Sequence, residues 1–153
     1  MNRRAAIAMT AAEAAAFLDA SRTVTCATIG RDGRPHLMPL WYVVRDGELW
    51  AWTYAKSQKV RNLERDPRCT LQVETGAEYG ELRGVMLACD AVIHRDLDAV
   101  APLGAAIARR YGGGDLTPEA EAALRVQAAK RVGLQFVERR RASWDHRKLE
   151  GTY

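Results

Sequence analysis

Cysteine, histidine and long apolar runs are all scarce in this chain of 153 residues. The three cysteines are odd in number and form no C-x-x-C pair, which argues against a disulfide framework and favours a reducing cytoplasm. The histidines His36, His94 and His146 are scattered, so we expect no metal site. No apolar run approaches the ~20 residues that a membrane-spanning helix needs, and the N-terminal residues lack the unbroken apolar stretch of a signal peptide.

The composition that remains is typical of one soluble globular domain. Apolar residues make up 48% of the chain and charged residues 27%, and 153 residues can bury a core of their own. We expect a single domain over residues 1–153, with a short flexible N-terminus (1–9) and a C-terminal tail (145–153). The net charge of +4 favours anionic partners. A solvated basic surface and a nucleic-acid module both fit this charge, but no basic and aromatic reading face is recognisable, so we expect no nucleic-acid partner and no membrane partner.

Hydrophobic periodicity predicts about six strands and three or four helices. A capping box at Thr10 and Glu13 begins a helix that ends near Asp19. A second helix begins near Asp96, and Thr117 with Pro118 opens a third that ends near Lys130. The predicted strands are 22–29, 35–44, 49–53, 69–74, 82–93 and 131–142.

The order of these elements indicates a mainly β fold with peripheral helices. Tight turns join the first three strands, which makes them antiparallel, and the chain lacks the alternation of strand and helix that builds a parallel sheet. The second strand is apolar on both faces, so it is either buried on both sides or faces a ligand on one. Pro39 within it cannot donate to a ladder, so an edge, a bulge or a bend is expected there.

The most informative stretch runs from Thr53 to Leu63. Ser57 is suited to cap a short helix that Pro67 ends. Cations at 56, 59 and 61 then cluster at the start of this helix, where the backbone already carries partial positive charge. Two interpretations remain open: the lysines are simply solvated, or an anion such as a phosphate binds the free N–H groups, the hydroxyl and the ammonium groups together.

Several segments together resemble the pyridoxamine 5′-phosphate oxidase-like, flavin-binding split-barrel superfamily. They are R-P-H-L-M-P-L-W-Y, D-G-E-L-W-A-W-T, K-S-Q-K-V-R-N-L-E-R-D-P-R-C-T-L and G-V-M-L-A-C-D-A. The ending S-W-D-H-R-K-L is similar to that of a branch that uses the deazaflavin coenzyme F-420. The resemblance implies a six-stranded antiparallel split β-barrel and a homodimer that binds the cofactor at its interface.

Matching positions, the resemblance also implies where the cofactor lies. It implies that Met38, Pro39 and Leu40 would pass beside the ring system. Trp52 and Thr53 would meet the polyol chain or the phosphate. Lys56, Ser57 and Lys59 would hold the phosphate. The chain departs from the vitamin oxidases proper, because it lacks their R-L-x-P ending and has Gly84 where they have glutamine, so oxidation of pyridoxine phosphate is not expected.

The resulting hypothesis is an oxidoreductase that transfers hydride between bound F-420 and a conjugated small-molecule acceptor. The cofactor would carry the chemistry, and the sequence indicates no catalytic side chain. An FMN-binding oxidoreductase or oxidase and a non-catalytic flavin or haem carrier are the alternatives. The aromatic residues Trp41, Tyr42, Trp50 and Trp52 could stack on a ring or simply fill the core. Trp144, His146 and Arg147 could close over the site. As an alternative, Trp144 packs against the barrel end while His146 and Arg147 are solvated.

Overall fold

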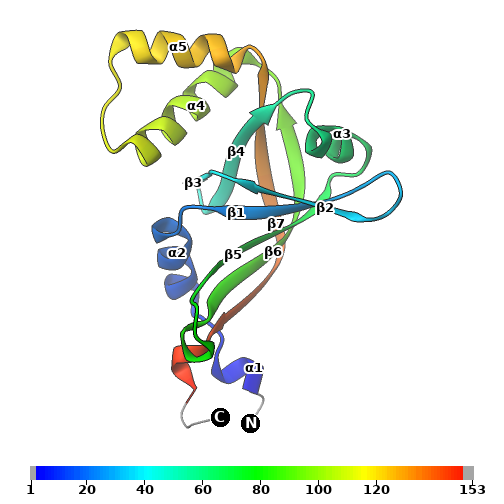
Figure 1. The fold of residues 1–153 in the computed structure, drawn as a ribbon, viewed down its shortest axis with the longest axis vertical. Helices are drawn as coiled ribbons and strands as arrows, with labels where there is room; N and C mark the ends of the chain where they lie inside the picture. Colours follow the sequence, from blue (N-terminus) through cyan, green and yellow to red (C-terminus); the bar gives the residue numbers. More distant parts are fainter. Residues whose placement is uncertain (1–2, 150–153) are drawn as a thin grey trace.

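The protein is mainly β with helices around the sheet, as the computed structural model of the chain shows for residues 3–149 (Figure 1). The strands are β1 (Val24–Ile29), β2 (Pro35–Leu40), β3 (Val43–Arg45), β4 (Glu48–Tyr54), β5 (Arg68–Thr75), β6 (Arg83–His94) and β7 (Arg131–Asp145). The α-helices are α1 (Arg3–Ala6), α2 (Ala11–Ala20), α3 (Gln58–Arg65), α4 (Leu97–Gly112) and α5 (Pro118–Ala128). Two short 3-10 turns complete them, η1 (Tyr79–Glu81) and η2 (His146–Lys148).

All the strands lie in one antiparallel seven-stranded sheet in the order β2-β1-β5-β6-β7-β4-β3. The prediction of a mainly β fold with peripheral helices is confirmed, but the predicted six-stranded split β-barrel is instead a seven-stranded sheet that does not close, because β2 and β3 are its two edges and do not pair. The physical reason is Tyr42, which divides the predicted strand 35–44. Its side chain is fully buried, its hydroxyl donates to the Leu18 carbonyl at 2.5 Å, and its backbone N–H bonds to the Tyr111 hydroxyl at 3.0 Å.

The main core fills the concave side of this curled sheet. Residues in β1 alternate between buried and half-buried, and Val24, Cys26 and Thr28 are the buried set. The same alternation continues into β5 and β6, whose inward residues join one apolar cluster with Phe17 of α2 and Val60 of α3. Helix α2 covers one end of this core, while α3 covers the other side near β1 (Figure 1).

Most helix boundaries follow the capping signals in the sequence. The Thr10 side chain accepts from the Glu13 N–H, and Glu13 in turn accepts from the Thr10 N–H, which confirms the capping box. Asp96 caps α4 and Thr117 caps α5, with Pro118 in the first turn, as predicted. Within residues 3–149, no helix has the length and apolar character needed to span a membrane.

Helix α4 packs against the outer side of β4 through a glycine. A Cβ atom on Gly104 would lie only 2.3 Å from the Trp52 ring, so this ring occupies the space that any other side chain would need. The contact joins α4 to a second apolar cluster that includes Val43, Leu103 and Ile107. Together α4 and α5 form a pair at one end of the molecule (Figure 1).

The segments near the two chain ends are hydrogen-bonded to each other, at the end of the molecule opposite to α4 and α5 (Figure 1). The Asp145 N–H donates to the Ile7 carbonyl, and the Met9 N–H donates to the Ser143 hydroxyl. Strand β7 thus extends to Asp145, where the predicted tail begins, and η2 follows it. The parts of the predicted N-terminus and tail at 1–2 and 150–153 lie outside the described residues.

Candidate functional site

A groove opens between edge strand β2 on one side and β4, the start of β7 and α3 on the other. It has a volume of about 480 Å³, within the range of ligand pockets. Edge strand β2 and the segment after it line one part, while α3, β4 and β7 line the rest. The lining residues are Thr23, Pro39, Leu40, Trp41, Trp52, Thr53, Lys59 and Arg131. Because the sheet does not close here, the groove reaches both the core and the surface.

The groove contains a buried lysine. Lys59 is 8% exposed, and its ammonium group donates to the Thr53 hydroxyl at 3.1 Å; that hydroxyl belongs to a residue only 6% exposed. No ion pair within residues 3–149 includes Lys59, although a buried cation ordinarily has an acidic partner. Burial lowers the pKa of Lys59 below its ordinary value of 10.5, and Cys26 opposes this shift only in part. The site therefore holds a positive charge without its counter-ion.

A second unsatisfied polar group lies at the start of α3. Ser57 occupies the N-cap position, as predicted from the sequence, but its hydroxyl makes no capping hydrogen bond. That oxygen is buried and has no partner in the described part of the chain. Since buried hydroxyls nearly always have a partner, the Ser57 hydroxyl is available to a ligand. The neighbouring Lys56 is exposed.

Helix α3 is held rigidly against the sheet by Asn62. This side chain is fully buried, donates to the Thr28 hydroxyl at 3.0 Å and accepts from Gln58 at 2.9 Å. The amide thus fixes the helix to β1 and fixes the first turn, which carries Lys59. Because these contacts lie within the chain, they fix the part of α3 that carries Lys59.

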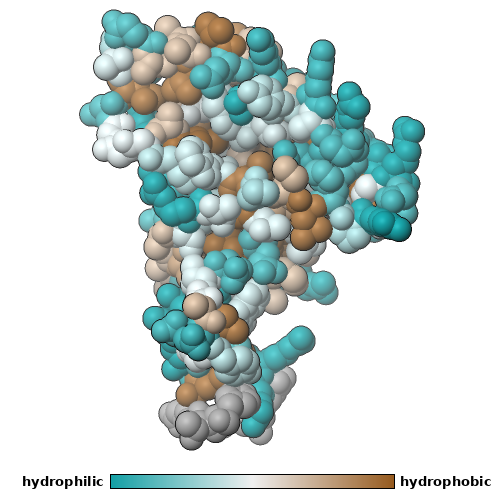
Figure 2. Space-filling model, viewed as in Figure 1, coloured by the Kyte–Doolittle hydropathy of each residue, from teal (hydrophilic) through white to brown (hydrophobic). Residues whose placement is uncertain are grey.

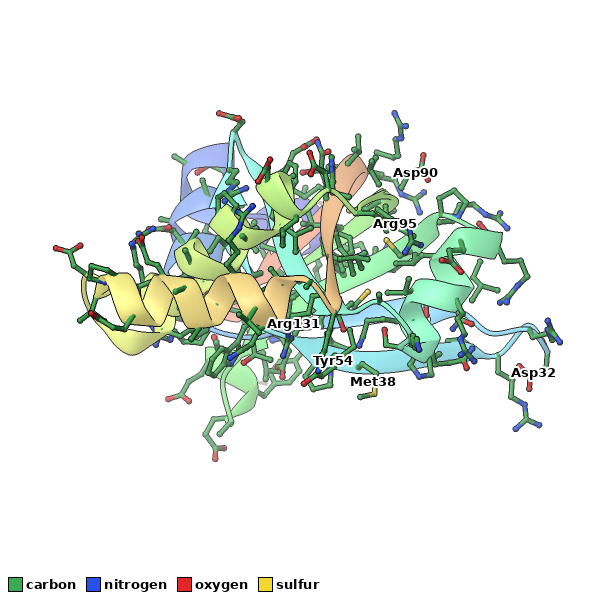
Figure 3. All side chains as sticks on the ribbon, turned by 90° about the horizontal axis from the view of Figure 1, so that it is seen from above. Asp32, Met38, Tyr54, Asp90, Arg95 and Arg131 are labelled. Carbon is green, nitrogen blue, oxygen red and sulfur yellow. The ribbon has the colours of Figure 1, made fainter. Side chains whose placement is uncertain are left out.

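Arg131 is a groove residue that the sequence analysis missed. Its guanidinium group lies 4.5 Å from the Trp52 ring centre and 4.2 Å from that of Tyr54. Figure 3 shows Arg131 beside Tyr54, with Met38 next in line on the β2 side. The Nε atom of Arg131 is buried and has no hydrogen-bond partner among the described residues. The sequence gives no signal for this position, because it depends on the pairing of Arg131 with Tyr54 across β4 and β7.

The structure brings together five of the residues implied by the resemblance: Pro39, Leu40, Trp52, Thr53 and Lys59 all line the groove. The others lie outside its lining: Met38, Lys56 and Ser57. Met38 lies on β2 opposite Cys26 and is 42% exposed. Trp52 is held between Gly104 of α4 and the Arg131 guanidinium, so its ring faces are occupied within the chain.

The described part of the predicted tail, with Trp144 before it, contacts the chain at the end of the sheet away from the groove. The Trp144 ring lies over Gly84, so closely that a Cβ atom there would come within 2.1 Å of it. The Asp145 carboxylate pairs with Arg83 and Arg147, and His146 bonds to the Tyr79 carbonyl at 2.8 Å. These contacts within the chain stabilise the end of the sheet away from α3 (Figure 1).

The three cysteine side chains are buried thiols, and none of them lines the groove. Cys26, Cys69 and Cys89 are all free and buried. A hydrogen bond from Cys69 lowers the pKa of Cys26 despite burial, and Lys59 adds to this shift. Burial raises the pKa of Cys89 to about 12. In residues 3–149, no group of three or more His, Cys, Asp or Glu side chains could hold a metal ion.

A known protein family matches the part of the chain that forms most of this groove. The model described as pyridoxamine 5′-phosphate oxidase matches residues 10–134, which is most of the chain. The chain belongs to the pyridoxamine 5′-phosphate oxidase family. The match includes β2, β4 and α3, which carry most of the groove, and ends within β7, just after Arg131. A comparison with curated proteins gives no match.

Solved structures of this fold include both similar and distant chains. The conserved hypothetical protein Rv2991 from Mycobacterium tuberculosis is 46% identical, with a TM-score of 0.89 over 98% of this chain and 94% of that one. An F-420 reductase is 21% identical, with a TM-score of 0.61 over 83% and 94%. The haem storage protein HutZ from Vibrio cholerae is 17% identical, with a TM-score of 0.65 over 82% and 87%. The last two share the fold of the pyridoxamine 5′-phosphate oxidase family with this chain.

Proposed function

We propose that this protein is an oxidoreductase that holds the phosphate of a flavin or deazaflavin at Lys59. The single observation that carries the proposal is the buried Lys59 ammonium group, which has a hydroxyl partner but no carboxylate within residues 3–149. A charge taken out of water without a counter-ion is costly, so an anionic ligand would recover much of that cost. Thr53 then acts as a second contact that orients the ammonium group.

The start of α3 adds donors to the same phosphate. The buried Ser57 hydroxyl lacks a partner in the described chain, and the first N–H groups of a helix point toward an incoming anion. Lys56, the residue before it, is exposed and can contribute charge at the surface. These groups fit a phosphate monoester or diester, because each is a donor or a cation. Lys56, Ser57 and Lys59 are therefore assigned to the phosphate.

The ring system is assigned to the part of the groove that lies beside β2. Pro39 and Leu40 provide an apolar wall there, and Met38 lies on the same strand. Pro39 lacks an N–H, which an edge strand tolerates without losing a ladder bond. Apolar walls with a few polar groups at one end are typical of cofactor sites.

We further propose that two copies of the chain associate over the open side of the groove. Large apolar side chains near β2 and β4 are exposed in one protomer: Leu37 at 57%, Met38 at 42% and Tyr54 at 58%. Figure 2 shows hydrophobic residues gathered in the middle of the face that carries β1 and β2, with hydrophilic residues over α3 and the β1–β2 turn. A homodimer would cover this surface and give the groove its missing wall. Light scattering on the purified chain tests the proposed dimer by mass.

Coenzyme F-420 is the cofactor that we propose first, with FMN as the alternative. When bound, a reduced deazaflavin would supply the hydride for a conjugated small-molecule acceptor and would leave as the oxidised coenzyme, and the acceptor would take one proton from water. The protein's residues bind and orient the phosphate, exclude water from the apolar wall and supply a positive field. Lys56 beside Ser57 adds charge suited to the anionic tail of the deazaflavin, and an F-420 reductase shares the fold.

A side-by-side titration of the purified protein with FMN and with F-420 tests the proposal. Tighter binding of F-420, followed by oxidation of the reduced coenzyme when a conjugated acceptor is added, is the expected result. Tighter binding of FMN would identify FMN as the cofactor and would leave the assigned binding site unchanged. Binding of either one without turnover over a panel of enones, quinones and unsaturated carboxylates would indicate a carrier. Failure to bind either cofactor would contradict the proposed function.

A further inference from the structure

We propose that Trp41 and Arg131 form a subsite at the mouth of the groove for a planar, conjugated acceptor that carries a carboxylate. This inference rests on the proposed function, because it names the class of molecule that the oxidoreductase would reduce. Both residues line the same groove as Lys59 and Thr53. Trp41 supplies a flat surface and Arg131 supplies the charge.

The Trp41 ring is exposed but held in place. It is 57% exposed and stacks on Tyr111, with ring centres 4.3 Å apart and planes 8° apart. Tyr111 is itself fixed, because its hydroxyl donates to the Arg22 carbonyl at 2.6 Å and accepts from the Tyr42 N–H at 3.0 Å. The Arg22 guanidinium also lies 4.7 Å from the Tyr111 ring centre. Trp41 is therefore a preorganised platform, since its supporting ring cannot move without breaking these bonds.

The other aromatic residues near the groove are engaged within the chain. Tyr42 is fully buried, Trp50 stacks on His94 at 5.0 Å, and Trp52 contacts Gly104 and Arg131. Trp41 differs from these three, because stacking on Tyr111 occupies one side of its ring while more than half of the residue stays exposed. Tyr54 is equally exposed, at 58%, but it does not line the groove. An exposed indole that is held rigidly is suited to stacking with a conjugated ligand.

Arg131 is also preorganised and lacks a counter-ion. Its guanidinium lies over the Trp52 and Tyr54 rings, which restrict its orientation. No ion pair in the described part of the chain includes Arg131, and its buried Nε lacks a hydrogen-bond partner there. The planar guanidinium fork matches a carboxylate with two parallel hydrogen bonds. The unused donors of Arg131 thus indicate an oxyanion of the ligand.

Two cations in one groove indicate two anionic groups. Lys59 lies on α3 and bonds to Thr53, whereas Arg131 lies at the start of β7 and packs on Trp52 and Tyr54. None of the residues lining the groove is acidic. If Lys59 holds the phosphate of the cofactor, Arg131 is left to bind the anionic group of the acceptor. The acceptor class is therefore a flat, unsaturated carboxylate rather than a neutral quinone.

Binding of two aromatic probes, naphthalene-2-carboxylate and the neutral naphthalene-2-carboxamide, tests the subsite without any turnover. Their dissociation constants are measured on the full chain, alone and with bound cofactor, following the indole N–H resonances by NMR. The variants are Arg131→Gln, Trp41→Leu and Trp41→Phe, with Arg34→Gln as the control because its side chain is 88% exposed. Circular dichroism verifies that each variant is folded. The cofactor affinity of each variant is measured in parallel.

We expect the wild type to bind the carboxylate at least tenfold more tightly than the carboxamide. Arg131→Gln should lose tenfold or more of the carboxylate affinity, the scale of a charge-assisted hydrogen bond, with little change for the carboxamide. Trp41→Leu should weaken both probes, Trp41→Phe should retain much of their binding, and Arg34→Gln should match the wild type. Cofactor affinity should stay within about twofold in Arg34→Gln, because Arg34 lies outside the groove.

Equal binding of the two probes, or unchanged binding in Arg131→Gln and Trp41→Leu, would overturn the subsite. A loss of cofactor affinity in Arg131→Gln without a loss of probe affinity would also overturn it, by assigning Arg131 to an anionic group of the cofactor. In both cases, a wild type that still binds the cofactor leaves the proposed function intact. A wild type that binds neither F-420 nor FMN would instead overturn the proposed function, and the acceptor role with it.

Discussion

The Lys59 ammonium group lies 3.1 Å from the Thr53 hydroxyl, and both residues are buried at the groove. If this ammonium group holds the phosphate, Lys59→Ala should weaken cofactor binding by roughly 1.5–3 kcal/mol, the scale of a hydrogen bond to a charged group. Isothermal titration calorimetry measures the difference. Lys130→Ala is the matched control, because Lys130 is exposed and lies outside the groove. An unchanged affinity in Lys59→Ala would count against the phosphate assignment.

Cofactor affinity should fall as the solution becomes alkaline. Burial lowers the pKa of Lys59 below 10.5, so this lysine loses its proton at a lower pH than an exposed lysine does. Only the protonated form attracts the phosphate, and affinity is therefore expected to decrease as pH rises through the Lys59 pKa. Dissociation constants measured at a series of pH values give the profile. The same series on Lys59→Ala should be flatter, and parallel profiles would exclude Lys59 as the titrating group.

Gly104 and Gly112 offer a matched pair of substitutions in α4. Alanine normally stabilises a helix interior by about 0.5–1 kcal/mol relative to glycine. Gly112→Ala should show at most this gain, because a Cβ atom there meets nothing within 4 Å and Gly112 is the last residue of α4. Gly104→Ala should instead destabilise by about 1–3 kcal/mol, the cost of overpacking, because its Cβ would lie 2.3 Å from the Trp52 ring. Urea unfolding measures both changes, and a stabilised Gly104→Ala would contradict the close packing of Trp52.

Low pH should weaken the ion pairs that Asp145 makes with Arg83 and Arg147. The hydrogen bond from Arg147 lowers the pKa of Asp145 from 3.8 to about 2, with Arg83 contributing through its charge. Since the folded-state pKa is depressed, this stabilisation is present above about pH 4 and is lost as pH falls toward 2. Thermal unfolding between these pH values should therefore show a steeper loss for the wild type than for Asp145→Asn. Equal slopes would indicate that other carboxylates dominate.

Local sequence signals predicted the elements well, because their causes are local. Thr10 with Glu13, Asp96, and Thr117 with Pro118 each cap a helix through bonds to residues that are near in sequence. The alternation in β1 likewise follows from which face of one strand is buried. Ser57 also occupies the predicted N-cap position of α3, although its hydroxyl makes no capping hydrogen bond.

Features that depend on distant contacts were not predictable from the sequence. The strand predicted over 35–44 divides because Tyr42 turns inward to reach Leu18 and Tyr111, which no local pattern shows. The cluster of cations near 56–61 drew attention to the phosphate site, but only the fold shows that Lys59 is buried. Arg131 reaches the groove only because β7 pairs with β4.

A crystal structure of the protein with bound cofactor tests the central claim most directly. The account predicts a phosphate oxygen within about 2.7–3.2 Å of the Lys59 ammonium group, the range of such hydrogen bonds, and a second contact to the Ser57 hydroxyl. It would be contradicted by a phosphate bound elsewhere while Lys59 still bonds only to Thr53.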